Sequence, residues 1–305
     1  MHHGYLVGLF DILGFEQKLA SIGLTEMLAR YEALIDAVNY RKEQVKRVFG
    51  DMNFEESAYW TAEGDVSIFS KTHGAYASDS ILLWANRTWP EARNKNSDDF
   101  ASLSKDPANG WTFHPIPCDN FLEVCNDLIC HGLDIGLPLR GAISMGEAVF
   151  DENKNIFLGR PIIDAARLER GQRLIGASLC KSFVDQTIPK RFLLQFDRHL
   201  KDGYAEQWGG FVLDWPRHWR RTKSGDAGKI IKAINNDDRY SSYYENTLDL
   251  VAHSRTYAGQ FESPEETSIR SVYSAFTFSN KELAVRARAI RRVPIEGATK
   301  ADPHR

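Results

Sequence analysis

Apolar and polar positions follow two different periods near the start of the chain, and each period indicates one element. The run from Tyr5 to Phe10 is almost wholly apolar and stops at the sequence DILG, which is typical of a buried strand that ends in a turn. From Thr25 to Val48 apolar residues recur at intervals of three and four, which predicts a long amphipathic helix with Thr25 as its N-cap. The apolar positions expected to face the core are Leu28, Tyr31, Leu34, Ile35, Val38 and Val45.

The sequence over 65–117 predicts a hairpin followed by a polar insertion. DVSIF, which begins at Asp65, and SILLWA, which begins at Ser80, are β-rich and flank a turn region that contains His73 and Gly74. The stretch 88–117 is rich in Asn, Asp, Ser and Pro. We therefore expect it to leave the core as an insertion.

The middle of the chain alternates between helical and strand patterns. A helical period over 121–133 is followed by a strand pattern over 139–150, and 156–158 can pair back on that strand. A second helix is expected over 162–174, with Pro161 at its first turn.

Together these elements predict a ferredoxin-like α+β fold, with a mostly antiparallel sheet and helices on one side. Further strands are expected at 193–196 and 210–213, and helices from Gly225 to about Ala284. The sequence thus predicts a core domain over 1–225 with the insertion at 88–117, a helical extension over 226–285 packed on that core, and a basic tail over 286–305.

Composition and charge narrow the function. The formal net charge of -3 gives no basic field to hold a polyanion, so a nucleic-acid-binding protein is disfavoured. The sequence has no run of 18 apolar residues, and its start has neither a charged region nor a small-residue cleavage site, so we expect a cytoplasmic protein that does not contact membranes. Four cysteines without a CxxC pair are expected to be reduced, and Cys125, Cys130 and His131 to lie on a buried helix face rather than on zinc.

Asp11 is the first candidate for metal-dependent chemistry. It ends the first predicted strand, and Gly14 allows a sharp turn into a helix start. The amide groups of Leu13, Gly14 and Phe15 could then point at phosphate oxygens. An isolated Asp before such a turn is more often a cap than a ligand, so a second carboxylate is needed.

Asp79 is the preferred second carboxylate, and Asp65 is its competitor. Two carboxylates at neighbouring strand ends are a common way to hold two divalent cations about 4 Å apart. Asp79 leads into the more apolar of the two β-rich segments, which favours it.

Four segments resemble the catalytic domain of class III nucleotidyl cyclases in sequence and order. They are FDILGF at 10–15, ASDSILLW at 77–84, LPLRGAISMGEAVF at 137–150 and LGRPIIDAARLE at 158–169. The resemblance implies that Asp11, the carbonyl of Ile12 and Asp79 hold two divalent cations, Mn²⁺ or Mg²⁺. It also implies attack of the ribose 3′-hydroxyl on the α-phosphate of a nucleoside triphosphate, with loss of pyrophosphate.

The resemblance further implies that Arg167 is catalytic and that the chain acts as a homodimer. The family places an Arg at this helix position to stabilise charge on the α-phosphate, and the helix faces the metal site of the partner. Without the other motifs, a surface Arg167 paired with Glu169 or Asp164 would be the simpler interpretation.

Three departures narrow the resemblance to the Pycsar pyrimidine cyclases of anti-phage defence. The family's ribose-positioning Asn is replaced by Ile163, its purine-reading Lys by Ala75, and its acidic purine reader falls near Ile156. The resemblance implies a uridylate cyclase that makes cyclic UMP for a separate effector protein. The alternatives are a cytidylate cyclase, an adenylyl or guanylyl cyclase, a two-metal phosphohydrolase, and an inactive cyclase-like module that only binds nucleotides.

Overall fold

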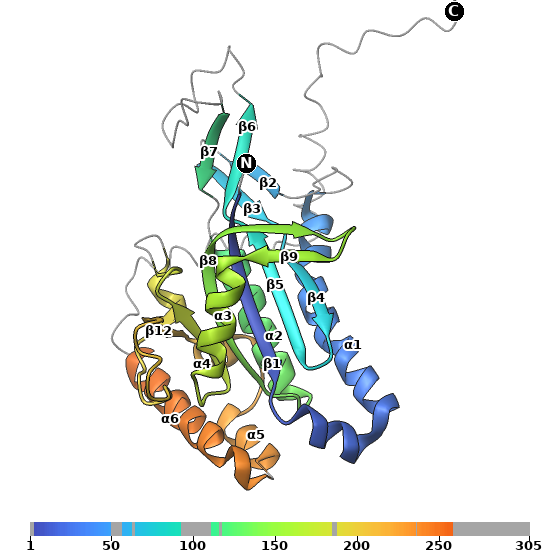
Figure 1. The fold of residues 1–305 in the computed structure, drawn as a ribbon, viewed down its shortest axis with the longest axis vertical. Coiled ribbons are helices and arrows are strands. Elements are labelled where there is room, and N and C mark those ends of the chain that lie inside the picture. The colour runs from blue at the N-terminus through green and yellow to red at the C-terminus, as the bar shows by residue number, and fades with distance from the viewer. Residues whose placement is uncertain are drawn as a thin grey trace, which may run out of the picture.

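The central sheet of the protein places its first strand in the middle. In the computed structural model, which describes residues 3–49, 57–62, 65–92, 111–115, 118–184, 188–235 and 237–258, the strand order is β11-β12-β10-β8-β1-β5-β4, and β9 pairs with β8 (Figure 1). The strands of this sheet are β1 (His3–Ile12), β4 (His73–Ala77), β5 (Ser80–Asn86), β8 (Leu139–Asp151), β9 (Ile156–Gly159), β10 (Gly176–Cys180), β11 (Leu193–Leu194) and β12 (Trp208–Leu213). The segment β8-β1-β5-β4 is antiparallel throughout and has the strand order of a ferredoxin-like fold, whereas β10 runs parallel to β8. The predicted α+β class is confirmed.

Helices cover both faces of the sheet, which corrects the expectation that they lie on one side. Helices α1 (Phe15–Phe49) and α2 (Asp119–Asp134) pack on one face, where Leu6 and Phe10 of β1 join the main core. Helix α3 (Arg160–Arg170) packs on the other face, where its Ala165 and Leu168 meet Leu9 of β1 and Ala142 of β8 (Figure 1). Because side chains alternate along a strand, Asp11 points to the same face as Leu9 and so to the face of α3.

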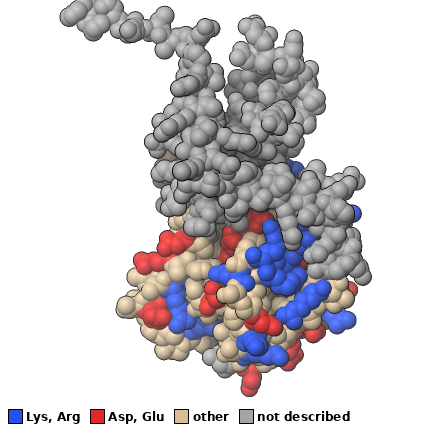
Figure 2. Space-filling model, turned by 180° about the vertical axis from the view of Figure 1, so that it is seen from behind, with Lys and Arg blue, Asp and Glu red and all other residues tan. Residues whose placement is uncertain are grey.

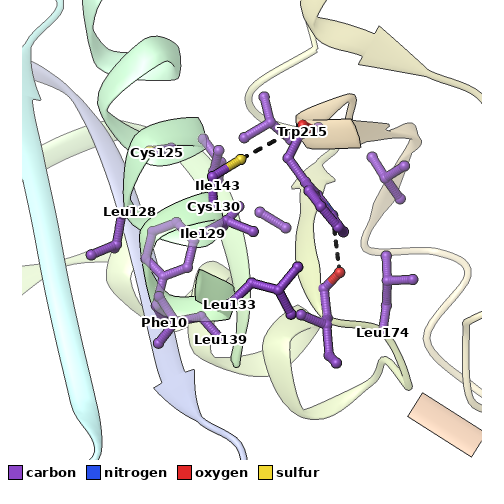
Figure 3. Packing of buried hydrophobic residues seen from close by; sticks show 14 of the residues in the cluster. Phe10, Cys125, Leu128, Ile129, Cys130, Leu133, Leu139, Ile143, Leu174 and Trp215 are labelled. Carbon is purple, nitrogen blue, oxygen red and sulfur yellow. Dashed lines mark hydrogen bonds between the residues drawn. The ribbon is translucent and has the colours of Figure 1, made fainter. Parts of the chain in front are cut away.

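The core between α2 and the sheet is apolar and contains the cysteines. Figure 3 shows Cys125 and Cys130 of α2 among Phe10, Ile143 and Trp215. The Cys130 thiol donates to the carbonyl of Trp215, with 3.7 Å between sulfur and oxygen. All four cysteines are free and buried, so the predicted buried helix face is confirmed.

The hairpin predicted between the segments from Asp65 and Ser80, with its turn at His73 and Gly74, is wrong, because His73 and Gly74 belong to strand β4, which itself pairs with β5. Strand β5 pairs with β4 across a two-residue turn formed by Ser78 and Asp79, and Ser78 has a φ of 56°. Such a left-handed residue is what a tight two-residue hairpin requires. The segment that begins at Asp65 forms β3 (Asp65–Ser70), which pairs with β2 (Ser57–Ala62) in a separate sheet.

The predicted insertion also forms a small sheet of its own. Strand β6 (Thr88–Ala92) pairs with β7 (Trp111–Pro115), and this pair is not part of the central sheet. Residues 93–110 lie outside the described part of the chain.

The long first helix begins earlier than predicted and is kinked. Gly23 has a φ of 80° and a ψ of 166° inside α1, so the helical period changes direction there. Leu34 and Val38 are buried as predicted, but Leu28 is 53% exposed and the buried position in that turn belongs to Met27.

The C-terminal helices pack on the same core as the sheet. They are α4 (Trp215–Thr222), α5 (Ala227–Ile234) and α6 (Ser241–Ala258), with the short 3₁₀ helices Lys190–Phe192 and Asp238–Tyr240 before and between them. Ile231 of α5 and Leu250 of α6 are fully buried within the main apolar cluster. The predicted helix region beyond Ala258 and the tail over 286–305 lie outside the described residues.

The described surface is mixed in charge. Figure 2 shows Lys and Arg side chains interspersed with Asp and Glu on the face opposite that of Figure 1. Among the described residues no helix is both long enough and apolar enough to cross a membrane.

Candidate functional site

Asp11 and Asp79 lie side by side at one end of the sheet. Asp11 pairs with Ser80 across the β1–β5 ladder, and the amide of Ile12 donates to the carbonyl of Asp79 at 2.9 Å. The Asp79 carboxylate is close enough to raise the pKa of Asp11. The structure therefore brings the two predicted residues together, and their role as metal ligands stays a prediction.

The surroundings of Asp11 oppose its negative charge. The pKa of Asp11 is raised to about 6, chiefly by burial and to a lesser degree by the carboxylates of Glu169 and Asp79, whereas Arg140 acts in the opposite direction. Arg140 is the cation that contacts Asp11 directly, while Arg170 and Lys201 act on Glu169 alone.

This donor set suits a hard divalent cation. Oxygen ligands from one or two carboxylates are how Mg²⁺ is held in proteins when substrate phosphates supply the remaining ligands. The described residues contain no cluster of three or more His, Cys, Asp or Glu side chains arranged to hold a metal. A cation on Asp11 and Asp79 would therefore need further oxygens from outside these side chains, and the roles of these residues and of the Ile12 carbonyl as ligands stay a prediction.

Arg140 is a residue of this site that the sequence interpretation missed. It faces Asp11 directly across the β1–β8 ladder, and its Nη2 lies 3.0 Å from Oδ2 of Asp11. It also forms an ion pair with Glu169 of α3. Burial lowers the pKa of Arg140, but the charges of Glu169 and Asp11 outweigh this and the net change is upward.

A signal for Arg140 was present in the sequence. It is the only charged residue between Asp134 and Glu147, in a strand that is otherwise apolar or small. A lone charge within a buried strand needs a partner, and here the partners are acidic residues that are distant in sequence.

The turn after Asp11 has the geometry that the sequence predicts, with one difference. Gly14 has a φ of 71°, a conformation that favours glycine. The amide of Leu13, however, already donates to the carbonyl of Pro138 at 2.9 Å, so this group is occupied within the chain. Phosphate binding by the amides of Gly14 and Phe15 stays a prediction.

Two phenols lie on the other side of Asp79. Burial raises the pKa of Tyr31, and the charge of Asp79 raises it further. Burial likewise raises the pKa of Tyr76 to about 12, and the two rings meet edge to face at 6.4 Å. Within the described part of the chain neither hydroxyl has a hydrogen-bond partner, and Tyr31 is the phenol on which the charge of Asp79 acts.

Arg167 does not join this cluster through an ion pair. It lies on the exposed side of α3, one turn after Ile163, while Glu169 on the buried side pairs with Arg140. Asp164 pairs instead with Arg160. Among the described residues Arg167 has no ion pair, so the simpler interpretation of a surface salt bridge is not what the structure contains.

Asp65, the competing carboxylate, belongs to a different sheet from Asp11. It opens β3, which pairs only with β2, and its side chain is outside the described set. Of the two candidates, Asp79 is the one that the structure places beside Asp11.

Comparisons with known proteins add one structural similarity. No family model and no curated protein matches this chain. Among solved structures, it is similar to the crystal structure of the catalytic core of a rhodopsin-guanylyl cyclase with converted specificity in complex with ATPαS, with a TM-score of 0.40 and 13% sequence identity over 69% of this chain and 96% of that chain. A TM-score below 0.5 does not establish a shared fold, so the residues of this chain must carry any functional conclusion.

Proposed function

We propose that this chain is a nucleotidyl cyclase, which converts a nucleoside triphosphate to a 3′,5′-cyclic monophosphate and pyrophosphate. The observation that carries the proposal is that Asp11 and Asp79 lie at neighbouring strand ends, where the amide of Ile12 donates to the carbonyl of Asp79 at 2.9 Å. The four motifs that resemble class III cyclases supply the reaction class.

In this proposal the acidic residues bind the metal cations and Arg140 binds the polyphosphate. Asp11 and Asp79 would hold two divalent cations, and these would supply activation of the 3′-hydroxyl and neutralisation of the pyrophosphate. Arg140 contacts Asp11 and is the cation in direct contact with the pair, so it is placed to meet a polyphosphate oxygen. The 3′-oxygen bonds to the α-phosphorus as the bond to the β-phosphate oxygen breaks, and no covalent intermediate on the protein is needed.

A homodimer would bring Arg167 of one copy to the acidic pair of the other. An exposed apolar patch supports this: Val149 and Leu158 are cross-strand partners on the outer face of the β8–β9 hairpin, and Leu158 is 64% exposed. Ile163, four residues before Arg167 on α3, is 49% exposed. Exposed apolar residues grouped in this way are typical of a contact surface, and here the partner would be a second copy.

The hairpin carrying this patch is held firmly by its other face. Phe150 of β8 stacks on Trp84 of β5 with ring centroids 4.7 Å apart, and Phe157 of β9 lies 5.4 Å from the same ring. Since alternate residues of a strand point to opposite faces, this aromatic contact leaves Val149 and Leu158 pointing outward.

We propose UTP as the substrate, with cyclic UMP as a second messenger in anti-phage defence that a separate effector protein reads. Support comes from the narrower resemblance and from the apolar residues Ala75, Ile156 and Ile163 at positions where purine cyclases carry polar ones. CTP, ATP and GTP are the alternatives.

The test is to incubate the pure protein with each of the four triphosphates and Mn²⁺, and to identify products by mass spectrometry. We expect cyclic UMP and pyrophosphate. Cyclic CMP or a cyclic purine nucleotide would change the substrate but keep the class, whereas linear mono- or diphosphate would indicate a phosphohydrolase. Triphosphate binding without any product would indicate a nucleotide-binding module, for which Ile163 in place of Asn is the supporting feature.

A further inference from the structure

Helix α6 of the C-terminal extension reaches the candidate site through Tyr243. The hydroxyl of Tyr243 accepts a hydrogen bond from Nη1 of Arg140 at 3.1 Å, and the Tyr243 ring centroid lies 5.7 Å from the Arg140 guanidinium carbon. No motif in the sequence connects this helix with the site. We propose that Tyr243 is a positioning residue, which together with Glu169 holds Arg140 beside Asp11, so that the extension completes the site within the same chain.

Arg140 is held from three directions. Its Nη2 contacts Asp11 of β1, its Nε faces Glu169 of α3, and its Nη1 donates to Tyr243 of α6. A long Arg side chain has several rotamers, and a planar guanidinium with a partner at each nitrogen keeps only one of them. When a divalent cation takes the Asp11 carboxylate, Glu169 and Tyr243 are the two contacts that remain to orient Arg140 toward a phosphate.

Tyr243 is itself fixed by contacts that do not involve Arg140. Oγ1 of Thr247, one turn later on α6, accepts a hydrogen bond from the amide of Ile175 at 2.9 Å. The side chain of Asn246 donates to the carbonyl of Arg173 at 2.8 Å. These bonds fasten α6 to the loop between α3 and β10, so the Tyr243 hydroxyl cannot follow Arg140 if that side chain moves.

The same turn of the extension also meets the loop after Asp11. A Cβ on Gly14 would lie 3.3 Å from the ring of Tyr240, and the rings of Tyr240 and Tyr243 are 6.0 Å apart, edge to face. The two tyrosines thus contact both sequence segments that bear the site, the β1 turn and Arg140 of β8. A role limited to core packing does not require the hydroxyl of Tyr243 to meet a charged residue, which makes that hydroxyl the group to test.

The test compares Tyr243→Phe with Tyr244→Phe in the full chain. Both variants remove one hydroxyl from adjacent buried residues of α6, but only the first removes a bond to Arg140. Binding of the α,β-methylene analogues of UTP, CTP, ATP and GTP is measured by calorimetry with Mn²⁺. For the analogue that the wild type binds best, we expect about tenfold weaker binding in Tyr243→Phe and unchanged binding in Tyr244→Phe, since one hydrogen bond to a charged group is lost.

A double-mutant cycle separates positioning from general destabilisation. Arg140→Lys keeps the charge but cannot make the bond to Tyr243 while still meeting Asp11 and Glu169. If Tyr243 acts through Arg140, Tyr243→Phe weakens binding little further in the Arg140→Lys background. Equal effects of Tyr243→Phe in both backgrounds, or equal binding by the two Tyr→Phe variants, would overturn the proposal.

This inference rests on the proposed function, and a spectroscopic measurement keeps the two distinguishable. In ¹⁵N-labelled protein, the Nε–H resonance of Arg140, identified by its absence in Arg140→Lys, should shift or broaden in Tyr243→Phe and not in Tyr244→Phe. An unchanged resonance would show that Tyr243 does not hold Arg140, whatever the enzyme makes. A changed resonance in a protein that binds no triphosphate would leave the positioning contact standing and refute the cyclase.

Discussion

Two buried clusters in this protein each combine carboxylates with one basic residue. They differ in how the basic residue is placed relative to the carboxylates. At the candidate site, Asp11 and Glu169 form ion pairs with Arg140, Asp79 lies beside Asp11, and Arg170 and Lys201 act on Glu169 without forming an ion pair with it among the described residues. Between α2 and α4, His218 lies between two carboxylates, with Nδ1 3.0 Å from Glu123 and Nε2 2.7 Å from Asp127. The pKa of Asp11 in the first cluster and that of His218 in the second are both raised, but the effect on the charged form is opposite for an acid and a base.

The raised pKa of Asp11, about 6, means that folding disfavours its charged form. For His218, burial lowers the pKa, but the hydrogen bonds and charges of Asp127 and Glu123 outweigh it and the net change is upward, so folding favours its charged form. The first cluster therefore lacks positive charge that a ligand could supply. The second supplies its own counter-charge and binds two helices together. Buried charge alone does not mark a functional site, whereas unbalanced buried charge is a reason to look for a ligand.

The largest expected effect comes from the unbalanced cluster. Asp11→Asn or Asp79→Asn should reduce cyclic nucleotide formation by about 1,000-fold, because each removes a carboxylate from the proposed cation pair. The thermal midpoint of Asp11→Asn at pH 7.5 should be no lower than that of the wild type, since the neutral amide removes a charge that burial, the main cause of the raised pKa of Asp11, disfavours. Product assay and calorimetric melting check both parts.

Asp65→Asn is the control, and its activity should stay at the wild-type level. Loss of activity in this variant with full activity in Asp79→Asn would mean that the wrong carboxylate was chosen.

The balanced cluster should respond in the opposite manner. His218→Gln removes the ion pairs of His218 with the buried Glu123 and the half-buried Asp127, so the free energy of unfolding should fall by about 3 kcal/mol. Activity per folded molecule should change little, because His218 joins α2 to α4 and is not part of the acidic pair. Urea unfolding gives the first quantity and an assay normalised to folded protein gives the second. A variant that keeps its stability and loses turnover would reverse our assignment of the two clusters.

The part of the fold that follows from local pattern could be predicted, and the part that depends on choosing a partner could not. The strand before Asp11 and the turn at Gly14 are local, and both are confirmed. The partner of β5 was wrong because the segment from Asp65 has the same β-rich pattern as the segment from His73, and the pattern does not say which of them pairs with β5. Leu28 was wrong because Met27 and Leu28 lie four and three residues before Tyr31, so the helical period fits both and does not say which one is buried.

Some residues of the candidate site could likewise be predicted from local sequence, and others could not. Asp11 and Asp79 end or precede apolar runs, which is a visible local signal. Arg140 and Tyr243 become site residues only when β8 and α6 are placed against β1, and they are about 100 residues apart in sequence. Neither strand nor helix periodicity contains that information.

Substitution of Arg167 tests whether this side chain acts on the site of the partner subunit in a dimer. Arg167→Ala should lower turnover by about 100-fold if the side chain stabilises charge on the α-phosphate. Because Arg167 is exposed and has no ion pair among the described residues, the thermal midpoint should not change. Steady-state kinetics and melting curves decide this.

Mixing variants sharpens the dimer prediction. An equal mixture of Asp11→Asn and Arg167→Ala chains, unfolded and refolded together, forms mixed dimers in which one pocket of two is intact, so about a quarter of wild-type activity should return. Each variant refolded alone should stay inactive. A mixture no more active than its components would mean that Arg167 does not act on the site of the partner.

The smallest expected effect is a pH dependence of stability that belongs to the balanced cluster. The pKa of His218 in the folded protein lies above its ordinary value of 6.5, so the proton is bound more tightly in the folded state. Its stabilising contribution is therefore complete below pH 6.5 and is lost as pH rises through the folded pKa. Thermal midpoints measured from pH 6.5 to pH 9 should fall in the wild type and fall less steeply in His218→Gln. Asp11 cannot produce this slope, because its raised pKa of about 6 makes stability fall as pH rises from about 4 to about 6, which lies below the window. Parallel slopes in the two proteins would show that His218 is not the charged partner of Glu123 and Asp127, and the contrast between the clusters would then rest on Asp11 alone.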